Sequence, residues 1–379
     1  MDFEFTEEQK IFKNAISDFA EKEIAPLVDE AEENGHTPVE LFPKMAKLGY
    51  LCIRYPLEYG GAGADRVTEC IYVEELSRVC AGIAGALLVQ SSLGTSPIYN
   101  YGSEEQKQEY LLPAIRGEKI SSFGLTEPNA GSDVMAIETR AKKEGDSYII
   151  NGTKIFITNG PIADYVIVAA YTDKSKKSKG ISLFIVDKGT PGFTVSRKLD
   201  KLGGRATETA ELAFEDCKVS GKKLIGKEGE GLGMIMNTLT GGRIVTGARY
   251  LGIGQAAYEA ALRYAKERVQ FGKPIGKFQA ISFKLADMAM DLESARLMIY
   301  RAAWMDDNGK KCAKEASMAK VLGTEAAVRV TGEAVQIHGG YGYMMEYPVQ
   351  RYFRDAKLGT LVEGTSEIQR TIISRELGL

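Results

Sequence analysis

The chain has 379 residues, of which 44% are hydrophobic and 26% are charged, and its formal net charge is -3. This length is enough for two or three domains with a sizeable core. The near balance of charge excludes a general nucleic-acid-binding surface, and no apolar run approaches the ~20 residues that span a bilayer.

Targeting and metal-binding signals are absent from the sequence. The acidic start, MDFEFTEEQK, has neither an apolar signal core nor an arginine-rich transit pattern, which predicts a cytoplasmic protein. Five scattered cysteines without close spacing predict free, buried thiols. The only histidines are His36 and His338, so we expect no histidine triad and no metal site. Any catalysis must then rest on carboxylates and a cofactor.

Residues 1–118 predict a helical domain. Thr6 and Gln9 have the spacing of a capping box, and apolar residues recur behind them at helical spacing. The stretch SEEQKQEYLLPAI predicts another capped helix that stops near Pro113.

Residues 119–228 predict a β-barrel or sandwich domain. Asn151-Gly152 is a strong hairpin signal between two apolar runs, and four further short β-rich runs follow it. The basic run TDKSKKSKG between two of these strands is either a solvated loop, which we favour, or a phosphate-binding patch.

Residues 229–379 predict a C-terminal four-helix bundle. Long amphipathic segments cover 231–268, 277–307 and 313–337, and a short helix follows Ser366. The whole chain is therefore expected to have a multidomain α+β fold in the order helical, β, helical.

Four irregular stretches could carry chemistry, although each also has a purely structural interpretation. FGLTEPNAGSD (123–133) is a linker or a ring-binding loop, and ERVQFGKPIGKFQ (267–279) is a helix cap or a phosphate grip. QIHGGYGY (336–343) is a glycine cap or a close approach to phosphate. In VEGTSEIQR (362–370), Glu363 is either a catalytic base or an incidental acid before a helix begun by Ser366 and Gln369.

Taken in order, these stretches together with FITNG (156–160) resemble signatures of the acyl-CoA dehydrogenase family over the whole chain. The resemblance implies that family's fold, with FAD lying between the β domain and the C-terminal bundle. The implied FAD contacts are Phe123, Leu125, Thr126, Ser132, Phe156, Ile157, Thr158, Arg268, Phe271, Gln279, Gln336, Gly339, Gly340, Thr365 and Glu367. It also implies a homotetramer in which Arg268, Phe271 and Gln279 reach across a subunit boundary. The family usually has tryptophan at Phe156.

By the same resemblance, Glu363 is the catalytic base that removes the α-proton of an acyl-CoA thioester. The β-hydrogen leaves as hydride to flavin N5, which gives a trans-2-enoyl-CoA, and electrons pass to an electron-transfer flavoprotein. A buried carboxylate has the raised pKa that such a base needs. Some family members carry the base directly before Arg243, but this chain has Gly242 there.

The resemblance places substrate contacts at Ser132, Thr240, Arg243, Val362 and Gly364. The family often has tyrosine directly before the base, and the smaller Val362 leaves space there. Valine at this position is similar to non-decarboxylating glutaryl-CoA dehydrogenases. The segments VQSSL and PIYNYGSEEQ also resemble glutaryl-CoA dehydrogenases. Their carboxylate-binding arginine would align near Ala84, which predicts an apolar pocket wall. A free carboxylate would be costly to bury there, so a short, branched or alicyclic acyl group is favoured over glutaryl.

Four other activities remain open alternatives at this point. One is a non-decarboxylating glutaryl-CoA dehydrogenase, and another is an enoyl-CoA reductase that works in the reverse direction. An acyl-CoA oxidase is disfavoured because such chains are usually longer. A non-enzymatic CoA-binding scaffold is disfavoured by the retained Glu363 and the full set of FAD motifs.

Overall fold

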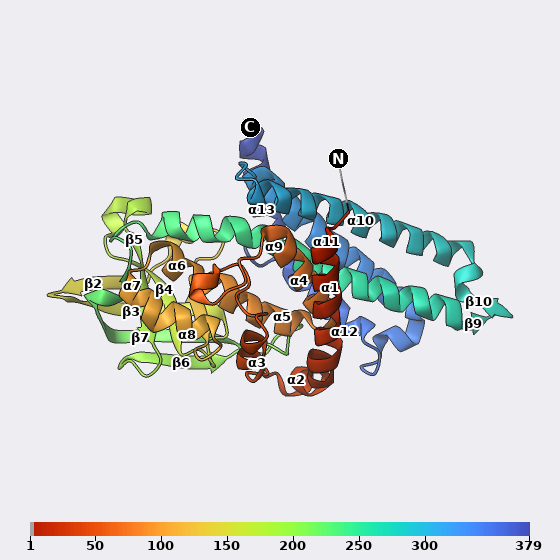
Figure 1. The fold of residues 1–379 in the computed structure, drawn as a ribbon, viewed down its shortest axis with the longest axis horizontal. Helices are drawn as coiled ribbons and strands as arrows, with labels where there is room; N and C mark the ends of the chain where they lie inside the picture. The colour runs from red at the N-terminus through yellow and green to blue at the C-terminus, as the bar shows by residue number, and fades with distance from the viewer. Residues whose placement is uncertain (1–3) are drawn as a thin grey trace.

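The computed structural model describes residues 4–379, so the first three residues of the acidic start lie outside it. The described chain runs from helices to a sheet and back to helices, as the sequence predicts. Figure 1 shows the sheet at one end of the elongated molecule, the N-terminal helices in the middle, and the C-terminal helices extending to the opposite end. Between residues 4 and 379, no helix is both long and apolar enough to cross a bilayer.

The N-terminal part consists of short helices. They are α1 (Glu7–Phe19), α2 (Val28–Asn34), α3 (Leu41–Lys47), α4 (Arg66–Val79), α5 (Ala81–Leu88), α6 (Ser96–Tyr101), α7 (Glu104–Gln106) and α8 (Leu112–Ile115), with π-helical turns η1 (Ala20–Ile24), η4 (Val89–Leu93) and η5 (Lys107–Leu111) continuing α1, α5 and α7. Both expected capping boxes are present, at Thr6 and Ser103. Helix α5 is buried along its whole length, because its sequence AGIAGALL has no polar face. It therefore lies at the centre of the molecule, between the sheet and the C-terminal helices.

The middle part forms one mixed sheet with the strand order β6-β7-β3-β2-β4-β5-β8, to which β1 adds in parallel beside β4. The strands are β1 (Ser121–Gly124), β2 (Arg140–Glu144), β3 (Ser147–Thr158), β4 (Tyr165–Tyr171), β5 (Ile181–Asp187), β6 (Phe193–Lys198), β7 (Thr209–Ser220) and β8 (Leu224–Ile225). The basic run forms an exposed 3-10 segment, η7 (Lys174–Lys179), in agreement with a solvated loop. All five cysteines are free and buried, as predicted.

The prediction of a hairpin at Asn151-Gly152 is wrong. Strand β3 runs unbroken through this pair, and the hairpin lies earlier in the chain, between β2 and β3 at Gly145, whose φ is +60°. Asn151 lies instead at a register shift against β7, where its side-chain oxygen accepts from the Asp216 N–H at 2.8 Å. Asn151 and Gly152 therefore lie at a β-bulge, a feature in which glycine is also common.

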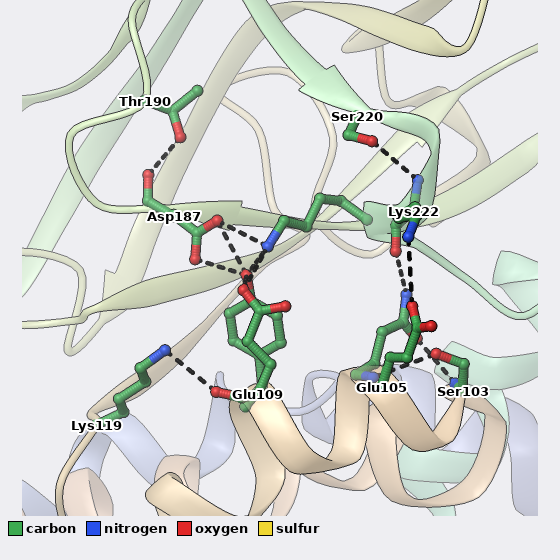
Figure 2. Close-up of polar contacts among 11 residues, drawn as sticks. Ser103, Glu105, Glu109, Lys119, Asp187, Thr190, Ser220 and Lys222 are labelled. Carbon is green, nitrogen blue, oxygen red and sulfur yellow. Dashed lines mark hydrogen bonds and ion pairs between the residues drawn. The ribbon is translucent and has the colours of Figure 1, made fainter.

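Polar contacts fasten the sheet to the N-terminal helices (Figure 2). The Tyr110 hydroxyl donates to Asp187 Oδ1 at 2.8 Å, and Lys223 Nζ lies 3.1 Å from Oδ2 of the same carboxylate. Beside them, Gln106 Nε2 donates to the Lys222 carbonyl at 2.8 Å. These contacts join η5 to β5 and α7 to the turn before β8, so they hold these helices against the edge of the sheet.

The C-terminal part contains the three predicted long helices, close to their expected bounds, and the short last helix. They are α9 (Gly231–Glu267), α10 (Gln279–Asp307), α11 (Ala313–His338) and α13 (Ser366–Glu376); α12 (Val349–Lys357) was not predicted, and β9 (Val269–Gln270) pairs with β10 (Lys273–Pro274) between α9 and α10. Figure 1 shows α9 running from the sheet to the far end of the molecule, where this small hairpin forms the tip.

Helices α9 and α11 approach closely because glycines face each other. A Cβ atom on Gly323 would lie 2.6 Å from the Gly247 carbonyl oxygen, and one on Gly247 would lie 2.9 Å from the Ala319 oxygen. Side chains would hold the two backbones apart at this point. The close approach brings the middle of α11 against the part of α9 that carries Gly242 and Arg243.

A buried acidic junction joins all three parts of the chain. Asp355 on α12 accepts from the Gly204 N–H at 2.7 Å, and Glu32 on α2 accepts from the Ala206 N–H at 2.9 Å. The second oxygen of each carboxylate is buried without a hydrogen-bond partner among the described residues. Burial, together with the negative charge of Glu32, raises the pKa of Asp355 to about 6, against the opposing pull of Arg351.

Replacing Asp355 by Asn should stabilise the protein above neutral pH. A raised carboxyl pKa means that the folded state favours the proton, so the wild type loses stability as pH rises from 3.8 through about 6. Asn keeps the acceptor for Gly204 and carries no charge. The apparent melting temperature of D355N should exceed that of the wild type by a few degrees at about pH 8, and by less at about pH 5. The exposed Asp200→Asn serves as control; an equal gain at both pH values would contradict the account.

Candidate active site

Glu363 lies in the short loop between η11 (Leu358–Thr360) and α13, and its backbone has an unusual conformation. Its φ is +52°, and Gly364 follows with φ +88°. Left-handed backbone is rare for a residue with a side chain, and such strain is concentrated at functional sites. Glycine at the next position accepts the second left-handed conformation without cost, so the turn projects the glutamate carboxylate back toward α9.

Two buried side chains hold this loop through its carbonyl oxygens. Lys320 on α11 donates from Nζ to the Gly364 oxygen at 2.9 Å. Gln369 donates from Nε2 to the oxygens of Glu363 and Gly364, at 2.9 and 3.1 Å. These bonds fix the strained backbone on which the carboxylate depends.

The last helix, α13, begins at Ser366 as predicted, but its cap lies one residue earlier than expected. Thr365 is the N-cap of α13 and accepts from the Ile368 N–H at 3.4 Å. Gln369 is the side chain that reaches back to the loop carbonyls, and it is completely buried. The sequence pattern therefore located the helix correctly but assigned the glutamine to the wrong contact.

The Glu363 carboxylate lies against α9 where that helix has no side chain. A Cβ atom on Gly242 would lie 2.5 Å from Glu363 Oε2. Oε2 itself is buried and has no hydrogen-bond partner among residues 4–379. The position that carries the base in some relatives is thus the position that here leaves room for Glu363.

Burial raises the pKa of Glu363 above its ordinary value. Four neighbours act in the opposite direction: the Thr246 hydroxyl, then the positive charges of Arg249, Lys320 and Arg243. The carboxylate therefore combines an increased proton affinity with enough nearby positive charge to ionise, which is the condition for a general base.

Arg243 and Thr240 differ in how ready they are to contact a ligand. Arg243 is 8% exposed, burial lowers its pKa, and its Nε atom is buried without a partner. An unpaired buried donor of this kind indicates a contact that a ligand completes. The Thr240 hydroxyl instead donates to the Met236 carbonyl of its own helix at 2.9 Å. Of the two predicted contacts on α9, Arg243 has the stronger structural support.

The loop after β1 and the bulge in β3 come together, as the sequence predicts. The Ile155 N–H donates to the Thr126 oxygen at 2.8 Å, and Phe123 and Leu125 are partly buried beside them. Phe156 has φ +62° and is 66% exposed, so its ring is turned out of the sheet. Thr158 is partly buried, whereas Ser132 is exposed at the far end of the loop.

Ile157 does not present its side chain to a ligand. It is 2% exposed and packs in the apolar core of the sheet. Neighbouring side chains in a strand point to opposite faces, so turning Phe156 outward directs Ile157 inward. Only the backbone of Ile157 is available for the contact predicted there.

A buried ion pair, which was not predicted, supports the loop after β1. Lys154, which is completely buried, donates to Glu127 Oε1 at 2.7 Å and to the Leu125 oxygen at 3.0 Å. Burial opposes ionisation of Glu127, but the charge of Lys154 and the hydrogen bonds it receives lower its pKa overall. The pair fixes the backbone of the TEP segment, while the exposed faces of the loop remain free.

Thr365 and Glu367 lie at the start of α13, and the other six predicted FAD contacts lie near the far end of α9. Arg268, Gly339 and Gly340 line one cavity of about 480 Å³, in which the Arg268 guanidinium lies 5.6 Å from the centre of the Tyr341 ring. A Cβ atom on Gly339 or Gly340 would meet nothing within 4 Å, so the glycine backbone faces open space. Gln336 is exposed on the last turns of α11 beside this cavity.

Phe271 and Gln279 flank the same end of the molecule. Phe271 lies in the β9–β10 turn with φ +50° and is 93% exposed, and Gln279 is exposed at the start of α10. At 1.5 Å per residue, Arg268 lies about 39 Å along α9 from Gly242. A ligand that contacted both ends within a single chain would have to span about this distance.

The expectation of an apolar wall near Ala84 is wrong in one respect. Ala84 is itself buried and apolar, but the guanidinium of Arg249 lies against the neighbouring Gly85. Arg249 comes from α9, which is more than 150 residues away in the sequence, so alignment of α5 alone could not reveal it.

Comparison with known proteins agrees with this arrangement over the whole chain. The N-terminal, middle and C-terminal domain models of acyl-CoA dehydrogenases match residues 6–118, 122–217 and 229–378. The chain therefore belongs to the acyl-CoA dehydrogenase family, whose members are flavoprotein oxidoreductases, and the resemblance read from the motifs is confirmed.

Individual relatives are similar from end to end. "Acyl-CoA dehydrogenase, short-chain specific" of Clostridium acetobutylicum is 47% identical over 377 residues, which is 100% of both chains. The structure of butyryl-CoA dehydrogenase from Megasphaera elsdenii is 46% identical, with a TM-score of 0.96 and 100% of both chains covered. A chain in the structure described as the electron transferring flavoprotein of Acidaminococcus fermentans is 48% identical, with a TM-score of 0.97, over 100% of this chain and 99% of that one.

Replacing Gly242 by Ala should lower activity without unfolding the protein. The new Cβ atom would meet the mobile end of Glu363, so the carboxylate is displaced while the helices keep their packing. A displacement of about 1 Å costs on the order of 100-fold in rate. Two quantities are measured, kcat with an acyl-CoA substrate and the melting temperature.

Gly233→Ala is the matched control, because it makes the same change on α9 where a Cβ atom meets nothing within 4 Å. That variant should keep full activity and gain up to about 1 kcal/mol of stability from its better helix propensity. Full activity in G242A would show that the carboxylate does not work from this position.

Proposed function

We propose that the protein catalyses the FAD-dependent α,β-dehydrogenation of a short acyl-CoA thioester, with Glu363 as the base that removes the α-proton. The observation that carries this proposal is a carboxylate buried against Gly242, with an unpaired Oε2 and a raised pKa, on a loop held in a strained conformation. A thioester α-proton is weakly acidic, so a base of increased proton affinity suits its removal.

The same loop offers a donor for the negative charge that develops on the thioester oxygen. The Glu363 N–H donates to no backbone oxygen among residues 4–379. A fixed and unused N–H next to the base can stabilise an enolate oxygen, in the manner of an oxyanion hole. Arg243, with its unpartnered Nε, is assigned to the CoA part of the substrate together with Thr240, Ser132 and Gly364.

The residues present fit FAD, although in two separate halves. Exposed Phe156 and the loop from Phe123 to Ser132 suit a flat ring, while Arg268 and the open glycine backbone at Gly339 and Gly340 suit a pyrophosphate. Bound there, FAD would accept the β-hydride at N5 and leave a trans-2-enoyl-CoA. Thr365 and Glu367, at the start of α13, are assigned to the ring half of the site.

A homotetramer would unite the two halves, and α10 carries a surface suited to it. Phe283, Met290, Leu297 and Trp304 recur every seven residues on this helix, and all four are about half exposed. Exposed apolar side chains in a row along a helix are typical of a helix-packing interface. We assign this row of four residues, the α10 stripe, to the contact between copies of the chain.

The proposed electron acceptor is an electron-transfer flavoprotein, and the proposed location is the cytoplasm. The similarity to a chain in the Acidaminococcus structure supports the first assignment. The acyl group is proposed to be short because the relatives named above act on short acyl-CoAs by name. Val362, only partly buried before the base, leaves room for a branch or ring beside the reacting carbons.

Replacing Glu363 by Gln should abolish flavin reduction while retaining the flavin. Loss of a general base costs on the order of 1000-fold in rate. The wild-type rate should also fall as pH falls through the raised pKa of Glu363, because only the ionised carboxylate accepts a proton. The measurement is anaerobic bleaching of bound flavin by butyryl-CoA across the pH range, with peroxide assayed in air to test for oxidase activity.

Stability gives an independent check on the same carboxylate. Because the folded state favours the protonated form, the wild type loses stability as pH rises through the raised pKa, and E363Q does not. Above that pKa the variant should melt at a higher temperature than the wild type. Glu376→Gln, at an exposed position on α13, is the control. Bleaching by E363Q at the wild-type rate would refute the assignment of Glu363 as the base.

Replacing Leu297 by Glu should dissociate the tetramer and release FAD. A charge in the α10 stripe cannot be buried against a second copy without a partner. Light scattering should show a smaller particle, and the flavin absorbance should be lost on gel filtration. Leu48→Glu makes the same change at an exposed leucine on another face and should leave both unchanged. A tetrameric, yellow L297E protein would contradict the proposed interface.

A further inference from the structure

Arg249 occupies a place that the shape of α5 makes for it. Its Nε and Nη2 atoms both donate to the Ala81 oxygen, at 3.0 and 2.6 Å. A Cβ atom on Gly85 would lie only 2.7 Å from the guanidinium carbon. Any side chain at Gly85 would therefore push the guanidinium away, so the glycine and the arginine depend on each other.

Arg249 forms no direct ion pair among the described residues, and its side-chain hydrogen bonds there both go to the Ala81 oxygen. A second cation is near, since burial and then the charge of Arg249 lower the pKa of Lys201 to about 8, against the negative charges of Glu32 and Asp355. A guanidinium stays charged under all ordinary conditions, so Arg249 keeps N–H groups that can bind a carboxylate directly.

Arg249 also faces the space in front of the base. It lies seven residues after Gly242 on α9, which is two turns and about 10 Å along the same face of the helix. Side chains on a helix lean toward its N-terminus, which directs the guanidinium back toward Gly242 and the Glu363 carboxylate. Its charge accordingly lowers the pKa of Glu363 more than that of Lys320 or Arg243 does.

The unusual small residues of this sequence gather around the same place. Val362 packs with Ala81 and Tyr250 in one small apolar cluster. A Cβ atom on Gly359 would lie 2.7 Å from the Tyr250 ring, and that ring lies 5.4 Å from the Arg249 guanidinium. Gly359 thus makes room for the Tyr250 ring and Gly85 for the Arg249 guanidinium, which lies beside the apolar cluster that Val362 joins.

We propose that Arg249 binds a carboxylate at the far end of the acyl group, so that the substrate is the CoA thioester of a short dicarboxylic acid. This inference rests on the proposed role of Glu363 as base and adds a specificity-determining residue to it. A guanidinium with N–H groups to spare and no direct ion pair is matched well by a carboxylate, through charge-assisted hydrogen bonds. Dicarboxylic substrates were disfavoured because position 84 is alanine and not arginine. Arg249 supplies the missing cation from α9.

The test compares acyl-CoAs that differ only at their far end. Succinyl-CoA pairs with butyryl-CoA, glutaryl-CoA with valeryl-CoA, and adipyl-CoA with hexanoyl-CoA, since each pair has equal carbon number and exchanges a carboxylate for a methyl group. The FAD-loaded enzyme is mixed with each compound without oxygen, and kcat/KM for flavin bleaching is measured. The carboxylate member of at least one pair should be preferred by more than about 10-fold.

Arg249→Gln should reverse that preference. Its kcat/KM should fall about 100-fold more for the preferred dicarboxylic thioester than for the methyl-ended partner, because the lost charge beside Glu363 affects both substrates alike. Arg249→Lys keeps the charge without the planar fork and should lose less. Arg197→Gln makes the same change at an exposed position on β6 and should behave as the wild type.

A binding measurement separates recognition from turnover. In the E363Q background, which holds substrate without reacting, calorimetry should show that R249Q weakens glutaryl-CoA about 100-fold and valeryl-CoA little. Equal losses for both ligands would show that Arg249 only fastens α5 to α9, and would overturn the proposal. A wild-type enzyme that prefers the methyl-ended member of every pair would also overturn the proposal for Arg249. That result would not affect the proposed dehydrogenase function. Bleaching by none of the six compounds would overturn both.

Discussion

The structure depends on one constraint, which is that a carboxylate must be buried in the middle of the protein and still ionise. Glu363 meets it through a left-handed turn that presents the side chain to α9 at a glycine. Burial increases its proton affinity, while Lys320 and the arginines of α9 keep the ionised form accessible. Because Lys320 also bonds the Gly364 oxygen, the same side chain holds the loop in place and contributes to the charge balance.

Helix α9 organises the rest of the site because it is in contact with every other part. Near its middle, Gly242 leaves room for the Glu363 carboxylate and Gly247 leaves room for α11, while the charges of Arg243 and Arg249 lower the pKa of Glu363. At its far end the helix supplies Arg268 to a separate cavity. One helix therefore carries residues at two places about 39 Å apart, which the proposed association of chain copies would bring together.

Much of this was predictable from the sequence, for reasons that differ between residues. Glu363 was assigned as the base because a local motif, EGTSEIQR, stands in order with four others, and this role stays a prediction. Helix bounds followed from apolar spacing and capping boxes. The Asn-Gly pair misled because the same dipeptide serves a bulge as readily as a turn. Ile157 was assigned by its place in a motif, and its inward direction is set by the bulge at Phe156.

The residues that the sequence did not reveal all act through tertiary contacts. Lys320 lies on the buried face of an alanine-rich helix, which was an available signal, but its partner is a carbonyl 44 residues away. Lys154 is defined by its contacts with Glu127 and the Leu125 oxygen, which lie in the loop after β1. Arg249 reaches from α9 to lie against Gly85 on α5, and no pattern within either helix predicts that contact.

The most direct test of the account is exchange of the substrate α-hydrogen with solvent. The FAD-loaded enzyme is incubated in D2O with excess acyl-CoA, without oxygen or an electron acceptor, and deuterium at the α-carbon is followed by proton NMR. The account predicts exchange that is fast in the wild type, declines as pH falls through the raised pKa of Glu363, and is reduced on the order of 1000-fold in E363Q. Exchange by E363Q at the wild-type rate would show that another group removes the proton.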